Sequence, residues 1–301
     1  MTSHRAVEKR STTFEESDTV NFVVLGNARC GSNLLGRALA THPQIRMAGE
    51  VLANQEFTRK VSWERVNPYA RPKVRGEGYQ AGEDAATFAE QHIFSSTPFD
   101  NIRAFGFKIF YDHARSDDAI GTIWPYLVQN PIRIIHIIRR NLLASYVSNE
   151  VALKTNEWHV AVDAGTPAAT EVPPFALDPF LVQRYFDELT NWRRWVDQTF
   201  ANKDILTISY EDELCGDFGA AANRAFEYVG VMRWVTRPAL QKQQGLPLEE
   251  QISNFGALRK HFRDTPYAEF FATDSAPGSG VNGNGSERRG LVASLLGRKQ
   301  E

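Results

Sequence analysis

Ten residues near the N-terminus have the types and spacing of a phosphate-binding loop. Residues 26–35 read Gly-Asn-Ala-Arg-Cys-Gly-Ser-Asn-Leu-Leu, so that four residues separate two glycines. A glycine-bounded turn that opens a helix points backbone N–H groups and the positive end of the helix dipole at an anion. Nucleotide-hydrolysing P-loops follow the second glycine with Lys and then Ser or Thr, whereas this chain has Ser32 and Asn33. The spacing therefore indicates a phosphate site without the lysine and the magnesium-binding hydroxyl position of those enzymes.

Arg29 is the only charged residue inside this loop. Its planar fork of donors could bind a phosphate through two hydrogen bonds. Ser32 could add a hydroxyl donor, and Gly31 allows the backbone to approach a ligand closely. Cys30 is interpreted as a small residue that fits the loop, because no histidine can be placed beside it to activate a nucleophile. A purely structural turn between strand and helix is the alternative.

A second candidate anion site lies where an apolar run ends in two arginines. Residues 132–138 are followed by Arg139 and Arg140, and residues 142–153 then have helical periodicity. Ligands of open α/β sheets bind at the carboxyl edge of the strands, where both arginines would lie. Arg140 and Ser148 are eight positions apart, mostly along the helix, so both could face one anion. A structural ion pair is the alternative for the two arginines.

The elements that must position these residues are predicted from apolar patterns. Apolar, β-branched-rich runs predict strands at residues 22–25, 104–110, 132–138 and 205–210. Helical periodicity covers residues 33–41, 85–95, 118–127, 142–153, 179–200 and 218–229, with Asp178 and Pro179 suited to the start of the fifth. Near-continuous apolar strands separated by helices predict an α/β, P-loop-like three-layer fold, with a mostly parallel central sheet and helices on both faces.

We expect one domain over residues 19–272. A flexible N-terminal arm, residues 1–18, precedes it, and residues 273–301 follow as a flexible linker and a short amphipathic tail helix that could dock a partner. Two stretches rich in charge, glycine or proline, residues 54–82 and 156–177, are expected to be lids or binding loops.

Composition argues against several classes of protein. The formal net charge of −2 gives no global basic field for nucleic acid. Two cysteines make no disulfide framework, no run approaches the roughly 18 apolar residues of a membrane span, and the polar N-terminus is not a secretory signal. We therefore expect a cytoplasmic protein without a transmembrane segment.

Taken in order, these motifs resemble the sulfotransferases that use 3′-phosphoadenosine 5′-phosphosulfate (PAPS). Residues 29–35, Arg-Cys-Gly-Ser-Asn-Leu-Leu, are similar to the family's first motif, and Arg139 or Arg140 with Ser148 is similar to its second. Residues 208–214, Ile-Ser-Tyr-Glu-Asp-Glu-Leu, resemble the family's Tyr-Glu-Asp-Leu strand end, and residues 251–267 its C-terminal closing segment. The resemblance covers about residues 20–272 and is greatest to the bacterial carbohydrate- and lipid-type branch.

The resemblance implies a binding site for PAPS. The loop would hold the 5′-phosphosulfate end through Arg29, Cys30, Gly31, Ser32 and Asn33. Arg140 and Ser148 would bind the 3′-phosphate with Arg139 as a neighbour, and Lys242 would lie in a segment that closes over the nucleotide. Cys30 stands where the family usually has Ser, and Asn33 where many members have Thr; both differences concern affinity more than activity.

The resemblance also implies a mechanism. Related branches use a Glu shortly after the first helix as general base, and Glu50 takes that place here. Because Glu50 follows Gly49 and is flanked by apolar residues, we expect partial desolvation and a raised pKa; an ordinary exposed Glu is the alternative. Arg29 would stabilise charge on the leaving group, and His113 is the next candidate base or an acceptor contact. No cluster has metal-ligand spacing, and sulfuryl transfer of this kind should need no metal.

The implied activity is transfer of a sulfuryl group from PAPS to a hydroxyl of a carbohydrate, lipid or small-metabolite acceptor. The alternatives are a P-loop kinase or NTPase-like nucleotide-binding protein, and a catalytically inactive scaffold with the same fold. A kinase would place an acidic residue at the end of a buried strand, whereas residues 132–138 are followed by Arg139. Lys108, in the middle of a predicted strand, either faces a cleft or marks an edge strand.

Overall fold

The computed structural model describes residues 19–52, 84–94, 101–114, 119–158, 160–161, 170–241 and 246–272. All but the last of these residues lie in Met1–Phe271, the first of two units into which the chain divides. The expected N-terminal arm, the tail helix and Lys242 lie outside the described residues, and the domain limits stay predictions.

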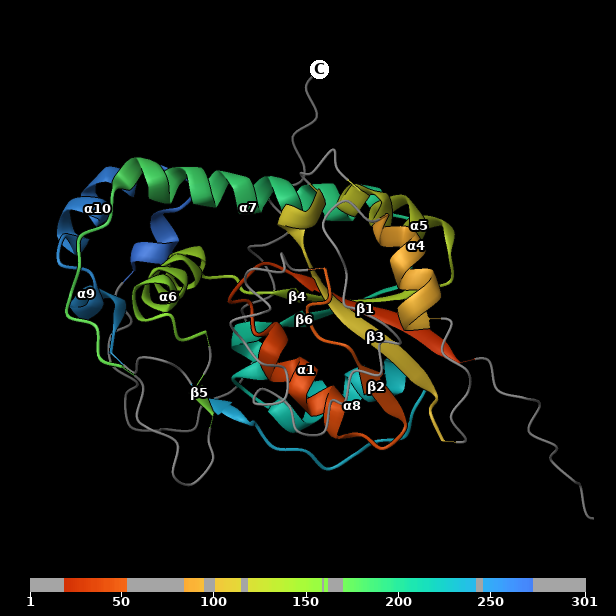
Figure 1. Ribbon diagram of the computed structural model, residues 1–301. Helices are drawn as coiled ribbons and strands as arrows, with labels where there is room; N and C mark the ends of the chain where they lie inside the picture. The colour runs from red at the N-terminus through yellow and green to blue at the C-terminus, as the bar shows by residue number, and fades with distance from the viewer. Residues whose placement is uncertain are drawn as a thin grey trace, which may run out of the picture. The chain divides into compact units, whose positions relative to one another are not determined.

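A parallel sheet of five strands, in the order β2-β3-β1-β4-β6, forms the centre of the fold (Figure 1). The strands are β1 Val20–Gly26, β2 Ile45–Met47, β3 Ala104–Phe110, β4 Arg133–Ile138 and β6 Ile205–Ser209. The predicted strands are confirmed as β1, β3, β4 and β6. With only three residues, β2 was too short to be recognised by its pattern. A second, antiparallel pair joins β5 Val160–Ala161 to β7 Leu240–Gln241, which also went unpredicted.

Successive residues of β1 enter different clusters of the hydrophobic core, one on each face of the sheet. Phe22 and Val24 pack with residues of α1 and α8, whereas Val23 and Leu25 pack with residues of α4, α5, α6 and α7. Because both faces are covered, the strand is apolar throughout rather than alternating, which is why its sequence reads as a continuous run.

The helices confirm the six predicted segments. They are α1 Ser32–Thr41, α4 Ala85–Phe88 continued by the π-helical turn Ala89–Phe94, α5 Ile123–Gln129, α6 Leu142–Thr155, α7 Pro179–Thr199 and α8 Phe218–Tyr228. Asp178 caps α7 by accepting from the N–H of Phe180, as expected from the Asp-Pro start. Two further helices among the described residues are α9 Leu248–Gln251 and α10 Phe255–Phe262, of which α10 lies within residues 251–267, the segment that resembles the family's closing region. No helix among the described residues is long and apolar enough to cross a membrane.

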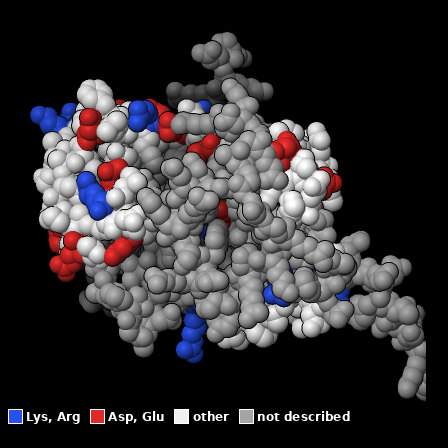
Figure 2. All heavy atoms as spheres, viewed as in Figure 1, with Lys and Arg blue, Asp and Glu red and all other residues white. Residues whose placement is uncertain are grey.

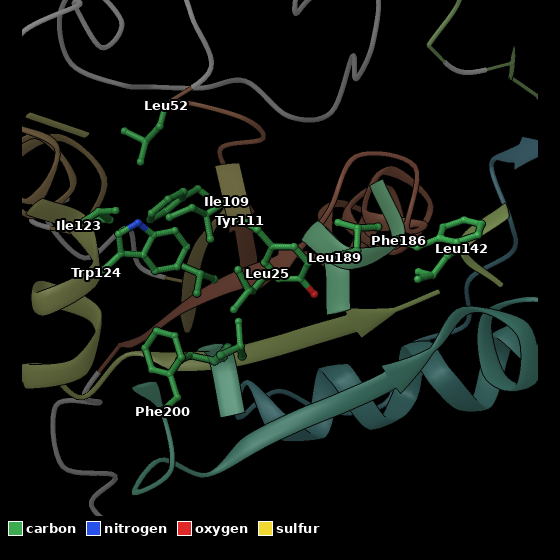
Figure 3. Packing of buried hydrophobic residues seen from close by; sticks show 14 of the residues in the cluster. Leu25, Leu52, Ile109, Tyr111, Ile123, Trp124, Leu142, Phe186, Leu189 and Phe200 are labelled. Atoms are coloured by element: carbon green, nitrogen blue, oxygen red, sulfur yellow. The ribbon is translucent and has the colours of Figure 1, made fainter. Parts of the chain in front are cut away.

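The larger core cluster fills the space between the sheet and the helices α5 and α7. The ring centroids of Trp124 and Trp195 lie 4.9 Å apart with perpendicular planes, and Phe200 packs against both. Figure 3 shows Trp124, Phe200 and Leu25 beside one another, and shows Tyr111 within the same cluster with its hydroxyl directed toward β4. Burial of each large side chain of this kind contributes about 1.5–3 kcal/mol to the stability of the fold, and so stabilises the packing of α5 and α7 on the sheet.

The parallel register brings the ends of the strands to one edge. Gly26 at the end of β1 pairs with Phe110 at the end of β3, and Ile138 at the end of β4 pairs with Ser209 at the end of β6. The segments that follow these four residues therefore start next to one another, at the edge where open α/β sheets bind ligands.

Candidate active site

The predicted phosphate loop occupies the turn between β1 and α1. Its backbone has a positive φ at Arg29 (67°) and at Gly31 (100°), and Gly31 caps the helix N-terminus. A Cβ added to Gly31 would lie 2.7 Å from Cδ2 of Tyr210, so both the conformation and the space require glycine. Ser32 and Asn33 begin the helix, where N–H groups lack intrahelical acceptors and can bind an anion.

Arg29 connects this loop to helix α6. Its Nε donates to Oγ of Ser148 at 3.0 Å, and its Nη1 donates to the backbone oxygen of Trp158. Burial and the neighbouring Arg139 guanidinium lower the pKa of Arg29 to about 10, so the side chain remains a cation at neutral pH. The structure thus brings together two residues that the sequence assigned to separate motifs.

The two consecutive arginines after β4 have different environments. The Arg139 guanidinium lies 4.6 Å from the ring centre of Tyr210 and donates to the backbone oxygen of Arg29 at 3.0 Å. The Arg140 side chain is 60% exposed and forms an ion pair with Asp212. Ser148 therefore contacts Arg29 rather than Arg140, and Arg139 is the arginine that lies against the loop.

Glu50 forms an ion pair near the start of helix α1. Lys108 donates to Oε1 of Glu50 at 2.5 Å and also to Oδ1 of Asn33, the second residue of α1. The Lys108 side chain is 6% exposed and that of Glu50 is 18% exposed. Glu50 is thus mostly buried and paired with an ammonium, a partner that the sequence did not indicate.

Lys108 is a residue whose role the sequence left undecided. Strand β3 lies between β2 and β1, so the edge-strand alternative is wrong and the lysine faces the site. The only sequence signal was its presence in the middle of an apolar strand, where an unpaired lysine would be costly.

His113 lies in the one-turn 3-10 helix Tyr111–Ala114, directly after β3. Its Nδ1 accepts from the N–H of Phe110 at 3.4 Å. Burial lowers the pKa of His113, while the charges of Asp112 and Glu50 oppose that shift. The imidazole is therefore neutral at pH 7. It lies close enough to Glu50 for the charge of the carboxylate to affect its pKa.

The side chains of Cys30 and Ser32 lie away from solvent. Cys30 is fully buried in the smaller core cluster, and a Cβ on Gly26 would lie 2.6 Å from its sulfur. Burial raises the pKa of the Cys30 thiol, which excludes an activated nucleophile. Ser32 is 3% exposed. Cys30 is thus the small packed residue that the sequence suggested.

Three polar side chains in the interior connect the loop to the helices α6 and α7. Nδ2 of Asn27 donates to Oγ of Ser145 at 3.1 Å, and Ser145 contacts the hydroxyl of Tyr185 at 2.9 Å. These contacts tie the loop to α6 and α7. None of the three residues was singled out from the sequence, because the pattern of each is that of an ordinary helix or turn residue.

The two halves of the site are neighbours. The charge of Glu50 acts on the pKa of Arg29, and Asn33 links Lys108 to the start of the loop helix. A cationic, hydrogen-bonding loop thus lies next to a carboxylate that can accept a proton. No group of His, Cys, Asp or Glu among the described residues could hold a metal ion. Figure 2 shows acidic and basic side chains interspersed on the described part of one face.

Comparisons with known proteins place this geometry in context. Residues 21–234 match the model of a family described as "Sulfotransferase family". Nodulation protein H of Rhizobium meliloti strain 1021 is 31% identical over 268 residues, covering 83% of this chain and 94% of that protein. Nodulation protein H of Rhizobium tropici is 26% identical over 270 residues, covering 85% and 94%. A solved sulfotransferase from Alicyclobacillus acidocaldarius is 13% identical with a TM-score of 0.44, covering 84% of this chain and 94% of that one.

Proposed function

The chain belongs to the sulfotransferase family and is an enzyme of sulfuryl transfer, and we propose that it uses PAPS to sulfate a hydroxyl of a carbohydrate, lipid or small-metabolite acceptor. The observation that carries the proposal is the 3.0 Å hydrogen bond from Nε of Arg29 to Ser148. This contact joins the phosphate loop to the helix that follows the paired arginines, so that the two anionic ends of one nucleotide can be bound together.

The residues at the site fit this donor. The positive-φ backbone at Arg29 and Gly31 and the start of α1 form a cradle for the 5′-phosphosulfate end. The Nε of Arg139 is buried and has no hydrogen-bond partner among the described residues, so a phosphate oxygen would satisfy a donor that is otherwise costly to bury. PAPS supplies the activated sulfuryl group, bonded to a phosphate that is a good leaving group.

Arg29 has the position and charge to stabilise the leaving group. Negative charge accumulates on the phosphate oxygen as its bond to sulfur breaks, and a fixed guanidinium stabilises that charge more in the transition state than before it. The contacts of Arg29 with Ser148 and Trp158 fix its orientation in advance, which removes the cost of reorganisation during the reaction.

Glu50 is the proposed general base. An acceptor hydroxyl must lose its proton as its oxygen attacks sulfur, and an ionised carboxylate in reach of that oxygen can take it. Lys108 forms an ion pair with Glu50 and holds it in one position, while the partial exposure of Glu50 leaves it accessible to an acceptor. His113, neutral because burial lowers its pKa, is the second candidate for this role.

Binding of nucleotides by calorimetry tests the donor assignment. We expect adenosine 3′,5′-bisphosphate to bind much more tightly than ADP, and the preference to be reduced in Arg139→Ala and in Arg140→Ala. For Arg140 the ligand must displace an exposed ion pair with Asp212, which costs less than about 1 kcal/mol.

Arg263→Ala provides the matched control, because Arg263 is an exposed arginine paired only with its neighbour Asp264 among the described residues. Equal affinity of the unmodified protein for adenosine 3′,5′-bisphosphate and ADP would overturn the donor assignment.

A further inference from the structure

The peptide group between Arg139 and Arg140 is held at both of its ends. Its carbonyl oxygen accepts from Nη2 of Arg193 at 2.5 Å, and its N–H, which belongs to Arg140, donates to Oε2 of Glu211 at 2.9 Å. In a planar trans peptide the C=O and the N–H point in opposite directions, so these two contacts fix the rotation of the whole plane. Arg193 comes from α7 and Glu211 from the turn after β6, so the peptide is clamped between two elements.

This clamp restricts the conformations of both neighbouring arginines. Rotation of the peptide plane changes ψ of Arg139 and φ of Arg140 together, so holding the plane fixes one backbone angle of each residue. Because the rotamers open to a side chain depend on its own φ and ψ, this restricts the directions that both guanidinium groups can take. In the clamped orientation Arg139 stacks on Tyr210 and donates to the carbonyl of Arg29. The donor-site arginines are therefore placed by a residue that belongs to neither motif.

Arg193 is itself firmly seated. It is half-buried on α7 and lies beside Tyr111, which is 2% exposed and whose hydroxyl contacts Nε2 of His136 at 2.6 Å. The guanidinium of Arg193 hydrogen-bonds the Tyr111 hydroxyl, and its charge acts on His136. Arg193 has no ion pair with a carboxylate among the described residues, so the carbonyl of Arg139 is one of the main hydrogen-bond acceptors for its guanidinium group.

We propose that Arg193 is a positioning residue for the 3′-phosphate: by holding the Arg139 carbonyl it aims Arg139 and Arg140 at that phosphate without contacting the nucleotide. The proposal rests on the proposed use of PAPS. The expected effect is on the 3′-phosphate rather than the 5′-phosphate, because the 5′ end would be bound by the loop and the start of α1. Arg193 is linked to that loop only indirectly among the described residues, through the hydrogen bond from Arg139 to the carbonyl of Arg29.

Calorimetry with two nucleotides tests the role of Arg193. Adenosine 3′,5′-bisphosphate reports both phosphates, and AMP reports the 5′-phosphate alone. We expect Arg193→Met to weaken binding of the bisphosphate about tenfold, the effect of one misplaced charge-assisted hydrogen bond, and to leave AMP affinity within about twofold. Arg193→Lys, which keeps the charge and one donor, should recover part of the loss.

The chain offers a close control. Arg194 is adjacent on α7 and exposed, and its Nη1 donates to Asn191 at 2.9 Å on the helix surface. Arg194→Met removes the same charge without touching the clamp, so it should change neither affinity. Should Arg193→Met fail to fold, Glu211→Ala opens the other end of the clamp and should give the same selective loss.

The outcomes separate this inference from the proposed function. A protein that binds AMP and the bisphosphate equally well before any substitution contradicts the use of PAPS itself. A protein that prefers the bisphosphate, with the preference intact in Arg193→Met or in Glu211→Ala, contradicts the positioning role alone. An equal loss of both nucleotides in Arg193→Met would likewise reduce Arg193 to a general structural residue.

Discussion

Glu50 can contribute to catalysis in two ways, and substitutions at Glu50 and Lys108 distinguish them. As a base it accepts the acceptor proton; as a counterion it only holds Lys108, whose ammonium lies 2.5 Å from its carboxylate. The informative set is Glu50→Gln, Lys108→Met and the double variant, because each side chain is replaced by one of similar size.

The structure sets the expected magnitudes. A positioned general base contributes about 10²–10⁴-fold to a rate, so Glu50→Gln should reduce turnover by about a hundredfold or more. Removing one partner of a buried ion pair costs about 3–5 kcal/mol of stability, but the carboxylate here is 18% exposed and regains some solvation. We therefore expect Lys108→Met to lower the free energy of unfolding by about 2–3 kcal/mol, and the double variant to recover part of that loss.

Turnover is measured as release of adenosine 3′,5′-bisphosphate from PAPS, with a hydroxyl acceptor found by screening carbohydrates, lipids and small metabolites. If Glu50 is the base, Glu50→Gln costs about a hundredfold both in the unmodified protein and in the Lys108→Met background. A loss confined to the unmodified protein would mean that Glu50 acts only through Lys108, and a loss below threefold in both would move the base to His113. Affinity for adenosine 3′,5′-bisphosphate should stay within about twofold throughout, because neither residue belongs to the proposed phosphate contacts.

Three further predictions follow from the surroundings of the site. Gly31→Ala should lower the free energy of unfolding by about 2–4 kcal/mol in urea titrations, since a side chain at φ 100° is strained and would lie 2.7 Å from Tyr210. The control Gly256→Ala lies in a helix where, apart from its chain neighbours and the helix's own backbone, no atom of the described residues is within 4 Å of the added Cβ, so it should be neutral or stabilising by up to about 1 kcal/mol. Equal effects of the two substitutions would refute the argument from strain. Burial lowers the pKa of His136 to about 4, so the unfolded state binds the proton first as the pH falls. Between pH 7 and pH 5 the free energy of unfolding should therefore fall by roughly 1–2 kcal/mol more in the unmodified protein than in His136→Gln. Parallel pH profiles of stability for the two proteins would contradict this prediction. Cys30→Ser should destabilise the fold by about 1–3 kcal/mol, because a hydroxyl replaces a packed sulfur in the core. The affinity for adenosine 3′,5′-bisphosphate, measured by calorimetry, should be unchanged. A clear gain in affinity would mean that residue 30 contacts the nucleotide.

Local sequence was sufficient for the elements that lie next to one another in the chain. The run before Gly26, the two glycines and the helical pattern after Ser32 specified a strand, a turn and a helix, and each is present. The start of α7 was likewise specified by Asp178 and Pro179, because capping and a preset φ act within one turn of the helix. These features depend on neighbours in sequence, and so they can be recognised without the fold.

Contacts between distant segments could only be decided by the tertiary structure. Arg29 and Ser148 are separated by 119 positions, and Lys108 and Glu50 by 58. Their meeting requires β3 to lie between β2 and β1 and β4 to lie beside β1, an order that apolar periodicity does not contain. For the same reason, the eight-residue spacing of Arg140 and Ser148 suggested a pair, whereas the fold places Arg29 against Ser148 and leaves Arg140 with Asp212.

The phosphate loop, the sheet and the family were therefore encoded in the sequence itself, because each depends on a short pattern of residue types. The tertiary structure decided which charged groups face one another. The packing of α7 on the sheet placed Arg193 at the carbonyl of Arg139, and the strand order placed Lys108 beside Glu50. Charged side chains are long and turn about several bonds, so their partners are set by the space that the packed core leaves for them.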